Sequence, residues 1–94
     1  MDTFATWTTQ GIIAGSGGVM TTEGGPITGD LTVHTTWIDG QAQVTVQHTG
    51  ASEWYGLAGS PVPADDEPTA RHAHQAAVEL VKDGGGSVFH FPAA

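Results

Sequence analysis

The segment that decides the fold runs from Leu31 to His48 and reads LTVHTTWIDGQAQVTVQH. Asp39-Gly40 at its centre is a strong signal for a two-residue hairpin turn, because both central residues of that turn adopt positive φ. With these two residues as the loop, the two arms pair in register as far as Leu31 opposite His48. Slippage by one residue would move the valines into water, so the sequence predicts a single register for an antiparallel hairpin with one buried face.

The two faces of this hairpin differ in chemistry, because side chains alternate along a strand. The predicted core face carries Leu31, Val33, Thr35, Trp37, Ala42, Val44, Val46 and His48. The predicted outer face carries Thr32, His34, Thr36, Ile38, Gln41, Gln43, Thr45 and Gln47. A half-buried sheet with a neutral surface of threonine and glutamine is therefore expected.

The second clear element is a helix that begins within residues 65–68. Asp65-Asp66-Glu67-Pro68 supplies an N-cap candidate, first-turn carboxylates that suit the helix dipole, and a proline that is tolerated near a helix start. Small and apolar side chains then recur at helical spacing up to Val81, and Gly84-Gly85-Gly86 stops the helix. The Ala-rich face predicts close packing of this helix against a sheet.

The remaining segments predict shorter strands. They are expected at Thr3–Thr9, Glu53–Ala58 and Ser87–Phe91, with a second hairpin that joins residues 12–14 to residues 19–21 around Gly15–Gly18. The run Gly24-Gly25-Pro26 is expected to interrupt the pattern. The order of elements predicts one α+β domain over residues 1–94, with an antiparallel sheet of five or six strands. One helix in the C-terminal half packs on one face of the sheet, and a final strand follows it.

The composition limits the kinds of partner. The chain carries ten carboxylates against two basic side chains, Arg71 and Lys82, and its formal net charge is −8. Such a surface repels nucleic-acid phosphates and anionic lipid, because affinity for both comes mainly from Lys and Arg. Binding to nucleic acid or to a membrane surface is therefore not expected. The chain has no cysteine, which excludes disulfides and thiolate metal sites.

The same composition gives an expectation for location and origin. The N-terminus has no basic leader, and no apolar run reaches the length of a membrane span, so a cytoplasmic protein is expected. Asparagine is absent and lysine occurs once, and both residues have AT-rich codons. This bias indicates a GC-rich genome, of a bacterium or of a phage.

Two glycine-containing motifs resemble enzyme loops only superficially. Gly11, Gly15 and Gly17 have the spacing of a dinucleotide-binding loop, but a strand-like run follows where that loop needs a helix. Ser16 stands in a sequence similar to a nucleophile elbow, which also needs a helix after it. Both motifs are interpreted as turn glycines, so neither a catalytic residue nor a cofactor is predicted.

The histidines give the alternative hypothesis, a small-ligand or metal-binding protein or an enzyme. His72 and His74 are two residues apart on a helix and point to nearly opposite sides, so they are not expected to share a metal ion. His74 is expected to face the core, His48 to lie on the core face of the hairpin, and His90 to flank the last strand. Together His48, His74 and His90 could line a site between the helix and the sheet.

The leading hypothesis is a non-catalytic interaction module that binds a protein partner or a second copy of itself. Trp54 and Tyr55 are adjacent on a predicted strand and face opposite sides, so both rings cannot enter one core. One of them, or Ile38 on the outer face that also carries His34, is expected to be partly exposed, and exposed aromatic side chains indicate an interface. The alternative is that the helix covers one ring and a loop covers the other.

The charge fits a regulator or inhibitor of a basic protein, and it also fits a structural protein of a virus or particle. Binding would use the outer face of the sheet or an edge strand, and an exposed edge at Ser87–Phe91 would favour self-association. No enzyme activity is predicted, because the sequence shows no credible nucleophile pair, paired carboxylates or cofactor loop.

Overall fold

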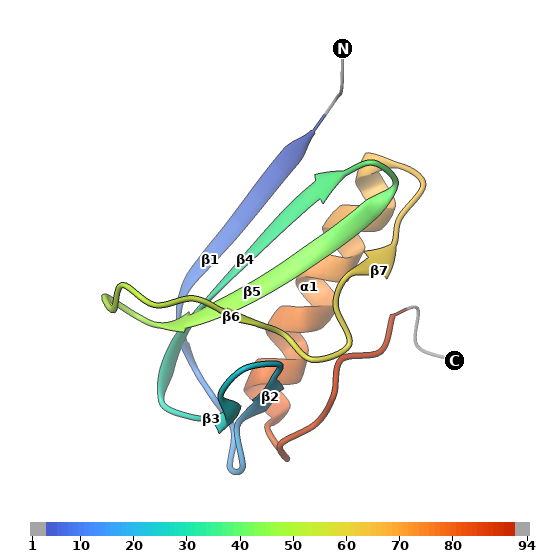
Figure 1. The fold of residues 1–94 in the computed structure, drawn as a ribbon. Coiled ribbons are helices and arrows are strands. Elements are labelled where there is room, and N and C mark those ends of the chain that lie inside the picture. Colours follow the sequence, from blue (N-terminus) through green and yellow to red (C-terminus); the bar gives the residue numbers. More distant parts are fainter. Residues whose placement is uncertain (1–3, 92–94) are drawn as a thin grey trace.

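The predicted hairpin is the centre of the fold in the computed structural model, which describes residues 4–91 (Figure 1). Its arms are β4 (Asp30–Ile38) and β5 (Gln41–His48), joined by Asp39 and Gly40 with φ angles of 54° and 74°. Leu31 pairs with His48, which is the predicted register. The valines of both arms are buried, because this register places all of them on one face.

The large sheet has the strand order β1-β4-β5-β6, with β7 also paired to β5. β1 (Ala5–Ile13) is the edge strand next to β4. The opposite edge of β5 is shared by β6 (Tyr55–Gly56), to which the predicted strand 53–58 is reduced, and β7 (Val62–Pro63). Between them, the Ser60 hydroxyl accepts a hydrogen bond from the backbone N–H of Val44 at 2.6 Å. Two short strands and one side chain therefore cover most of that edge.

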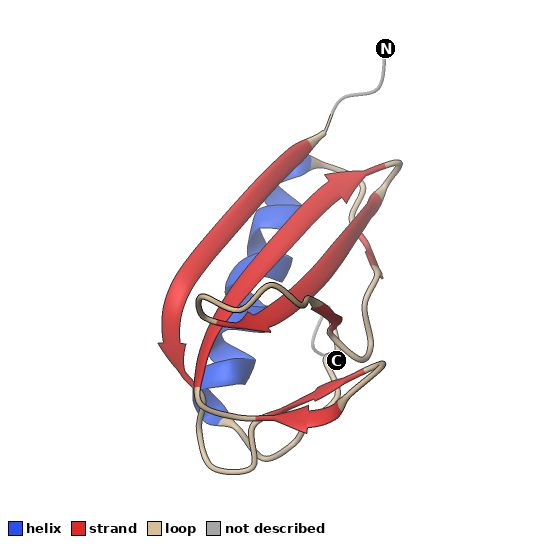
Figure 2. Ribbon diagram, turned by 60° about the vertical axis from the view of Figure 1, so that its left-hand side comes forward, coloured by secondary structure: helices blue, strands red, loops and turns tan. Residues whose placement is uncertain are grey.

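The helix α1 (Glu67–Asp83) packs across one face of the large sheet, as Figure 2 shows, and this confirms the predicted α+β architecture. Asp66 is the N-cap: its Oδ1 accepts a hydrogen bond from the N–H of Thr69 at 2.9 Å. Hydrogen bonding from the side chain of Thr69, and then from its backbone N–H, lowers the pKa of Asp66. The helix ends at Gly84, whose N–H donates to the Leu80 carbonyl at 3.0 Å. Three alanines on its inner face are fully buried, which lets the helix backbone lie close to the sheet: Ala70, Ala73 and Ala77.

The predicted second hairpin is wrong, because residues 12–14 and 19–21 do not pair with each other. Of the predicted strand Thr3–Thr9, Thr3 lies outside the described residues, and the strand continues past a β-bulge so that Ile12 and Ile13 also pair with β4. β2 (Val19–Thr21) pairs instead with β3 (Gly25–Ile27), the segment that was expected to interrupt the pattern. Pro26 is tolerated there, because a two-stranded sheet consists only of edge strands.

The predicted final strand is also wrong. Ser87 forms a single bridge with Val19, and residues 88–91 belong to no strand. The Ser87 carbonyl accepts from the N–H of Met20 at 3.2 Å, and the Phe89 N–H donates to the Ala58 carbonyl at 2.8 Å. Burial of the Phe89 ring anchors the segment. These contacts fix its path without the repeated pairing that a strand needs.

Two glycine-rich segments, Gly15–Gly18 and Gly84–Gly86, pack backbone against backbone, and we name them the glycine clasp. The Gly85 N–H donates to the Ser16 carbonyl at 2.7 Å, and the Gly86 N–H donates to the Gly18 carbonyl at 2.9 Å. A Cβ atom on Gly15 would lie 2.5 Å from the carbonyl oxygen of Lys82, and a Cβ atom on Gly84 would overlap the backbone of Gly15. The clasp therefore excludes side chains and fastens the end of the helix to the loop after β1.

Within residues 4–91, no helix is long and apolar enough to cross a membrane. The core lies between α1 and the inner face of the large sheet. The indole of Trp37 closes one end of it by donating from Nε1 to the Ala64 carbonyl at 2.9 Å.

Candidate interaction surface

The side of the large sheet opposite α1 carries a band of neutral side chains, which we name the outer face. Its members alternate with core residues along β1, β4 and β5, and they are Thr6, Thr8, Thr32, His34, Thr36, Ile38, Gln41, Gln43, Thr45 and Gln47. None of them is a carboxylate, a lysine or an arginine. Thr32 is buried beneath its hydrogen bond to Thr49, and the other members form a neutral surface on a chain whose net charge is −8.

His34 lies on the outer face and is held by neighbours on two strands. Its Nδ1 is 2.7 Å from the hydroxyl of Thr8 on β1, and its Nε2 is 3.4 Å from the hydroxyl of Thr36. The indole of Trp54 meets the imidazole in a T-shaped arrangement, with ring centroids 5.8 Å apart. Trp54 is 44% exposed despite this contact. We name His34 and Trp54 the aromatic patch.

Tyr55 and Ile38, the other two predicted interaction residues, lie apart from the aromatic patch. Tyr55 pairs with β5 and packs against the core, whereas Trp54, just before β6, contacts His34 on the outer face. Its hydroxyl donates to the Glu53 carboxylate at 3.0 Å, and this hydrogen bond raises the pKa of Tyr55. Ile38 is 39% exposed on the outer face, but it lies about 13 Å along β4 from His34, since a strand rises about 3.3 Å per residue.

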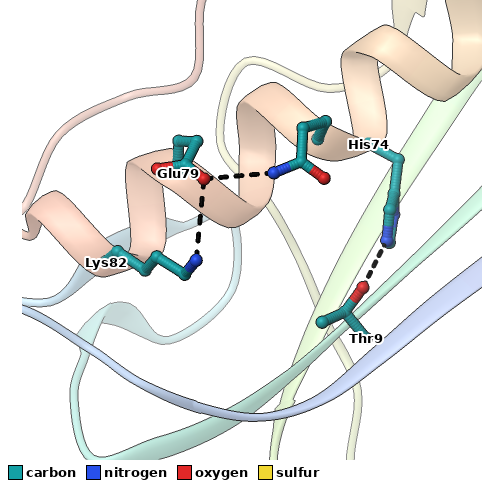
Figure 3. Close-up of polar contacts among 5 residues, drawn as sticks. Thr9, His74, Glu79 and Lys82 are labelled. Carbon is teal, nitrogen blue, oxygen red and sulfur yellow. Dashed lines mark hydrogen bonds and ion pairs between the residues drawn. The ribbon is translucent and has the colours of Figure 1, made fainter.

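His74 is buried between the helix and the sheet, and both of its ring nitrogens are engaged. Nε2 is 2.8 Å from the Thr9 hydroxyl, as Figure 3 shows, and Nδ1 is 2.7 Å from the Thr35 hydroxyl. The side chain is 6% exposed, and burial lowers the pKa of His74, with a further contribution from His34. A neutral imidazole donates through one nitrogen and accepts through the other, and a threonine hydroxyl can do either. Both contacts are therefore satisfied without a ligand.

The structure does not bring His48, His74 and His90 together. His48 pairs with Leu31 as predicted, but its side chain is exposed and not buried, because it occupies the last position of β5. His90 is exposed in the segment after the helix. Among residues 4–91, no three His, Cys, Asp or Glu side chains are grouped so that they could hold a metal ion.

His90 lines a shallow cavity of about 320 Å³ between the end of α1 and the segment that follows it. Most of the lining is apolar, and the other two predicted ligand histidines are not part of it. Glu79 also lines the cavity, but its carboxylate accepts from the Gln75 amide at 3.1 Å and lies 3.6 Å from the Lys82 ammonium (Figure 3). The cavity therefore presents one histidine and two carboxylates, those of Glu79 and Asp83, and the Glu79 carboxylate is engaged by its helix neighbours.

No protein-family model, curated protein or solved structure matches the chain. Around the aromatic patch, sequence patterning missed Thr8, which holds His34 from the neighbouring strand. The β1–β4 register, which pairs Thr8 with His34, is the signal that identifies it.

Proposed function

We propose that the chain is a small, acidic, non-catalytic protein-interaction module that binds a protein partner through the outer face of its sheet. The observation that carries this proposal is the aromatic patch, where Trp54 is 44% exposed while its ring is held against His34. Tryptophan is enriched at interface hot spots, because a large and rigid ring offers much contact area with few rotatable bonds. A ring that is already held in place loses little freedom when a partner covers it.

The surroundings of the patch favour a protein over a polyanion. The threonine hydroxyls and glutamine amides of the outer face can donate hydrogen bonds to a polypeptide and accept them from it. The net charge of −8 repels nucleic-acid phosphates and anionic lipid, and it speeds association with a basic protein. A cytoplasmic regulator or inhibitor of a basic protein fits this distribution, and so does a structural subunit of a virus or particle.

The histidine alternative has less support than the interaction role. Both ring nitrogens of His74 are bonded to threonine hydroxyls, and the cavity beside α1 contains His90 without His48 or His74. The proposal therefore assigns no catalytic residue, no metal and no cofactor.

The test compares Trp54→Ala with Val88→Ala, a matched control whose side chain is 43% exposed beside α1 and not on the outer face. The tagged wild-type chain captures binding proteins from its own host, and each captured protein is purified and titrated against the wild type and both variants. Trp54→Ala is expected to raise Kd roughly thirtyfold, because truncation of an interface tryptophan typically costs about 2 kcal/mol. Val88→Ala is expected to leave Kd unchanged.

Two results would count against the proposal. Binding that is unchanged in a natively folded Trp54→Ala variant contradicts the outer face as the contact surface. A chain that stays monomeric in native mass spectrometry, and binds no purified protein, contradicts the interaction role itself. A metal ion or small molecule bound to that monomer would favour the alternative, a ligand-binding protein that uses its histidines.

A further inference from the structure

β1 forms an open edge of the large sheet over nine residues, Ala5–Ile13. Figures 1 and 2 show it at the border of the sheet, and β4 is the only strand paired with it among residues 4–91. An edge strand presents unpaired N–H and C=O groups to any chain that can align with it. We propose that β1 pairs antiparallel with β1 of a second copy of this chain, which gives a symmetric dimer with one continuous sheet.

Hydrogen-bonded and non-bonded residue pairs alternate along the sheet, and this alternation identifies the β1 residues whose backbone groups point outward. In a two-residue hairpin the residues that flank the turn, here Ile38 and Gln41, exchange hydrogen bonds. Bonded and non-bonded pairs alternate, so the even-numbered residues of β4 are bonded to β5. The hydrogen bond from the Thr49 N–H to the Asp30 carbonyl, at 2.8 Å, agrees with this alternation. The odd-numbered residues of β4 are therefore bonded to β1.

Thr6 and Thr8 carry the outward backbone groups of β1. Trp7 pairs with Thr35, an odd-numbered residue of β4, so Trp7 turns its N–H and C=O toward β4. Thr6 and Thr8 flank Trp7 in the strand and direct their N–H and C=O groups away from the sheet. The open edge thus has two consecutive sites at which a second strand can exchange pairs of hydrogen bonds.

β1 lacks the features that usually protect an edge strand. Natural edge strands are commonly blocked by lysine and other charged side chains, or by proline. Residues 3–22 contain no Asp, Glu, Lys, Arg or Pro. One β-bulge lies between Thr9 and Ile12 and leaves Ala5 to Thr9 in regular register. The regular part of the edge is therefore open to a partner strand.

The absence of charged side chains on β1 allows a second copy to be that partner. Two chains of net charge −8 repel each other, so they associate best through a surface that has no carboxylates, and β1 is such a surface. Antiparallel pairing of identical strands is self-complementary about a two-fold axis.

Sedimentation velocity of the wild type, Thr6→Pro and Thr6→Val over a wide range of concentration tests the proposal. Proline removes the outward N–H of Thr6 and no bond to β4, whereas valine keeps the N–H and favours a strand. A monomer–dimer equilibrium is expected for the wild type and for Thr6→Val. Thr6→Pro is expected to weaken association roughly tenfold or more, because symmetry removes the bond twice. Added salt is expected to strengthen the dimer, since it screens the repulsion between the two acidic chains.

Hydrogen exchange on the wild type gives a second test that needs no variant. The amides of Thr6 and Thr8 are expected to exchange slowly at concentrations where the dimer forms and fast in dilute solution. The Trp7 amide, bonded to β4, is the internal control and is expected to be protected in both. Equal exchange at Thr6 and Thr8 under both conditions contradicts the pairing.

The edge and the aromatic patch are separate surfaces, and each has its own diagnostic variant. A wild type that is monomeric at every concentration overturns the dimer, whatever other protein Trp54 binds. A dimer that persists in folded Thr6→Pro and Thr8→Pro variants also overturns it. Self-association that is lost in Trp54→Ala and kept in Thr6→Pro also overturns the β1-paired dimer. That result would assign the contact between the two copies to the outer face.

Discussion

In the β4–β5 hairpin the contacts that fix the structure are made by side chains, whereas in the glycine clasp they are made by backbone atoms. Val33, Val44 and Val46 are fully buried on one face of the hairpin. Gly15 and Gly84 approach the opposing backbone so closely that a single Cβ atom has no room. Alanine therefore acts in opposite ways in the two regions: it removes needed atoms from the hairpin and adds forbidden ones to the clasp.

The largest effect is expected from Gly15→Ala, which adds one methyl group to the clasp. The new Cβ atom would lie 2.5 Å from the Lys82 carbonyl oxygen and 2.6 Å from the carbonyl carbon of Asp83, so the loop and the helix end must separate. Gly15 does not have a positive φ, so the substitution adds overlap without backbone strain. We expect the free energy of unfolding, measured by urea denaturation, to fall by about 3 kcal/mol.

Gly40→Ala is the matched control, because it has the opposite combination of properties. Gly40 has a φ of +74°, and a Cβ atom there meets nothing within 4 Å. The expected loss is about 1 kcal/mol, from the left-handed backbone alone. Equal losses in Gly15→Ala and Gly40→Ala would mean that close backbone packing does not hold the clasp.

A smaller loss, about 2 kcal/mol, is expected from Val44→Ala in the hairpin. The substitution removes two buried carbon atoms and leaves a cavity beneath the helix. Gln41→Ala, on the outer face of the same strand, is expected to change the free energy of unfolding by less than about 0.5 kcal/mol. Urea denaturation of both variants measures the difference, and similar losses would contradict the assignment of the two faces.

The smallest effect is expected from pH, and it arises from His74, which joins the hairpin to the helix. Burial lowers the pKa of His74 below its ordinary value of 6.5, so the unfolded chain binds a proton at a higher pH than the folded chain does. The free energy of unfolding is then highest above pH 6.5 and falls as the pH drops below 6.5 toward the folded pKa. The clasp has no ionisable side chain and contributes nothing to this change.

The measurement is urea denaturation between about pH 7.5 and pH 5, with the histidine pKa of 6.5 inside the range. His74→Gln is expected to reduce the loss of stability at low pH, whereas His72→Gln, which replaces an exposed histidine of the same helix, leaves it unchanged. An identical pH dependence in His74→Gln and the wild type would assign the effect to other groups.

The contrast between side-chain and backbone contacts also explains which parts of the fold could be predicted. The β4–β5 register follows from Asp39-Gly40 and the alternating valines, and the helix limits follow from Asp66 and Gly84, because all these signals are local. The pairing of β2 with β3 could not be predicted, since strands of three residues carry too little alternation to select a partner. The backbone contacts of the glycine clasp, which ends at Gly18 just before β2, also leave no alternating pattern of side chains.

The candidate surface could be predicted in part. The β4 and β5 members of the outer face follow from the hairpin register, and the opposite placement of Trp54 and Tyr55 matches the alternation of the predicted strand 53–58. The contact between His34 and Trp54 could not be predicted, because the path of residues 49–53 has no periodicity to read. The exposure of His48 was missed for another reason: register gives the side of the sheet on which a residue lies but not whether anything covers it.

The Ser60 hydroxyl has a consequence for the size of the assembly. It occupies the backbone N–H of Val44 in the space between β6 and β7, so within the described residues the far edge of the sheet offers another strand no run of open groups. Two chains joined at β1 would therefore have no second long edge to offer. Growth by strand addition would end at two copies, and the assembly would close instead of propagating as a fibril.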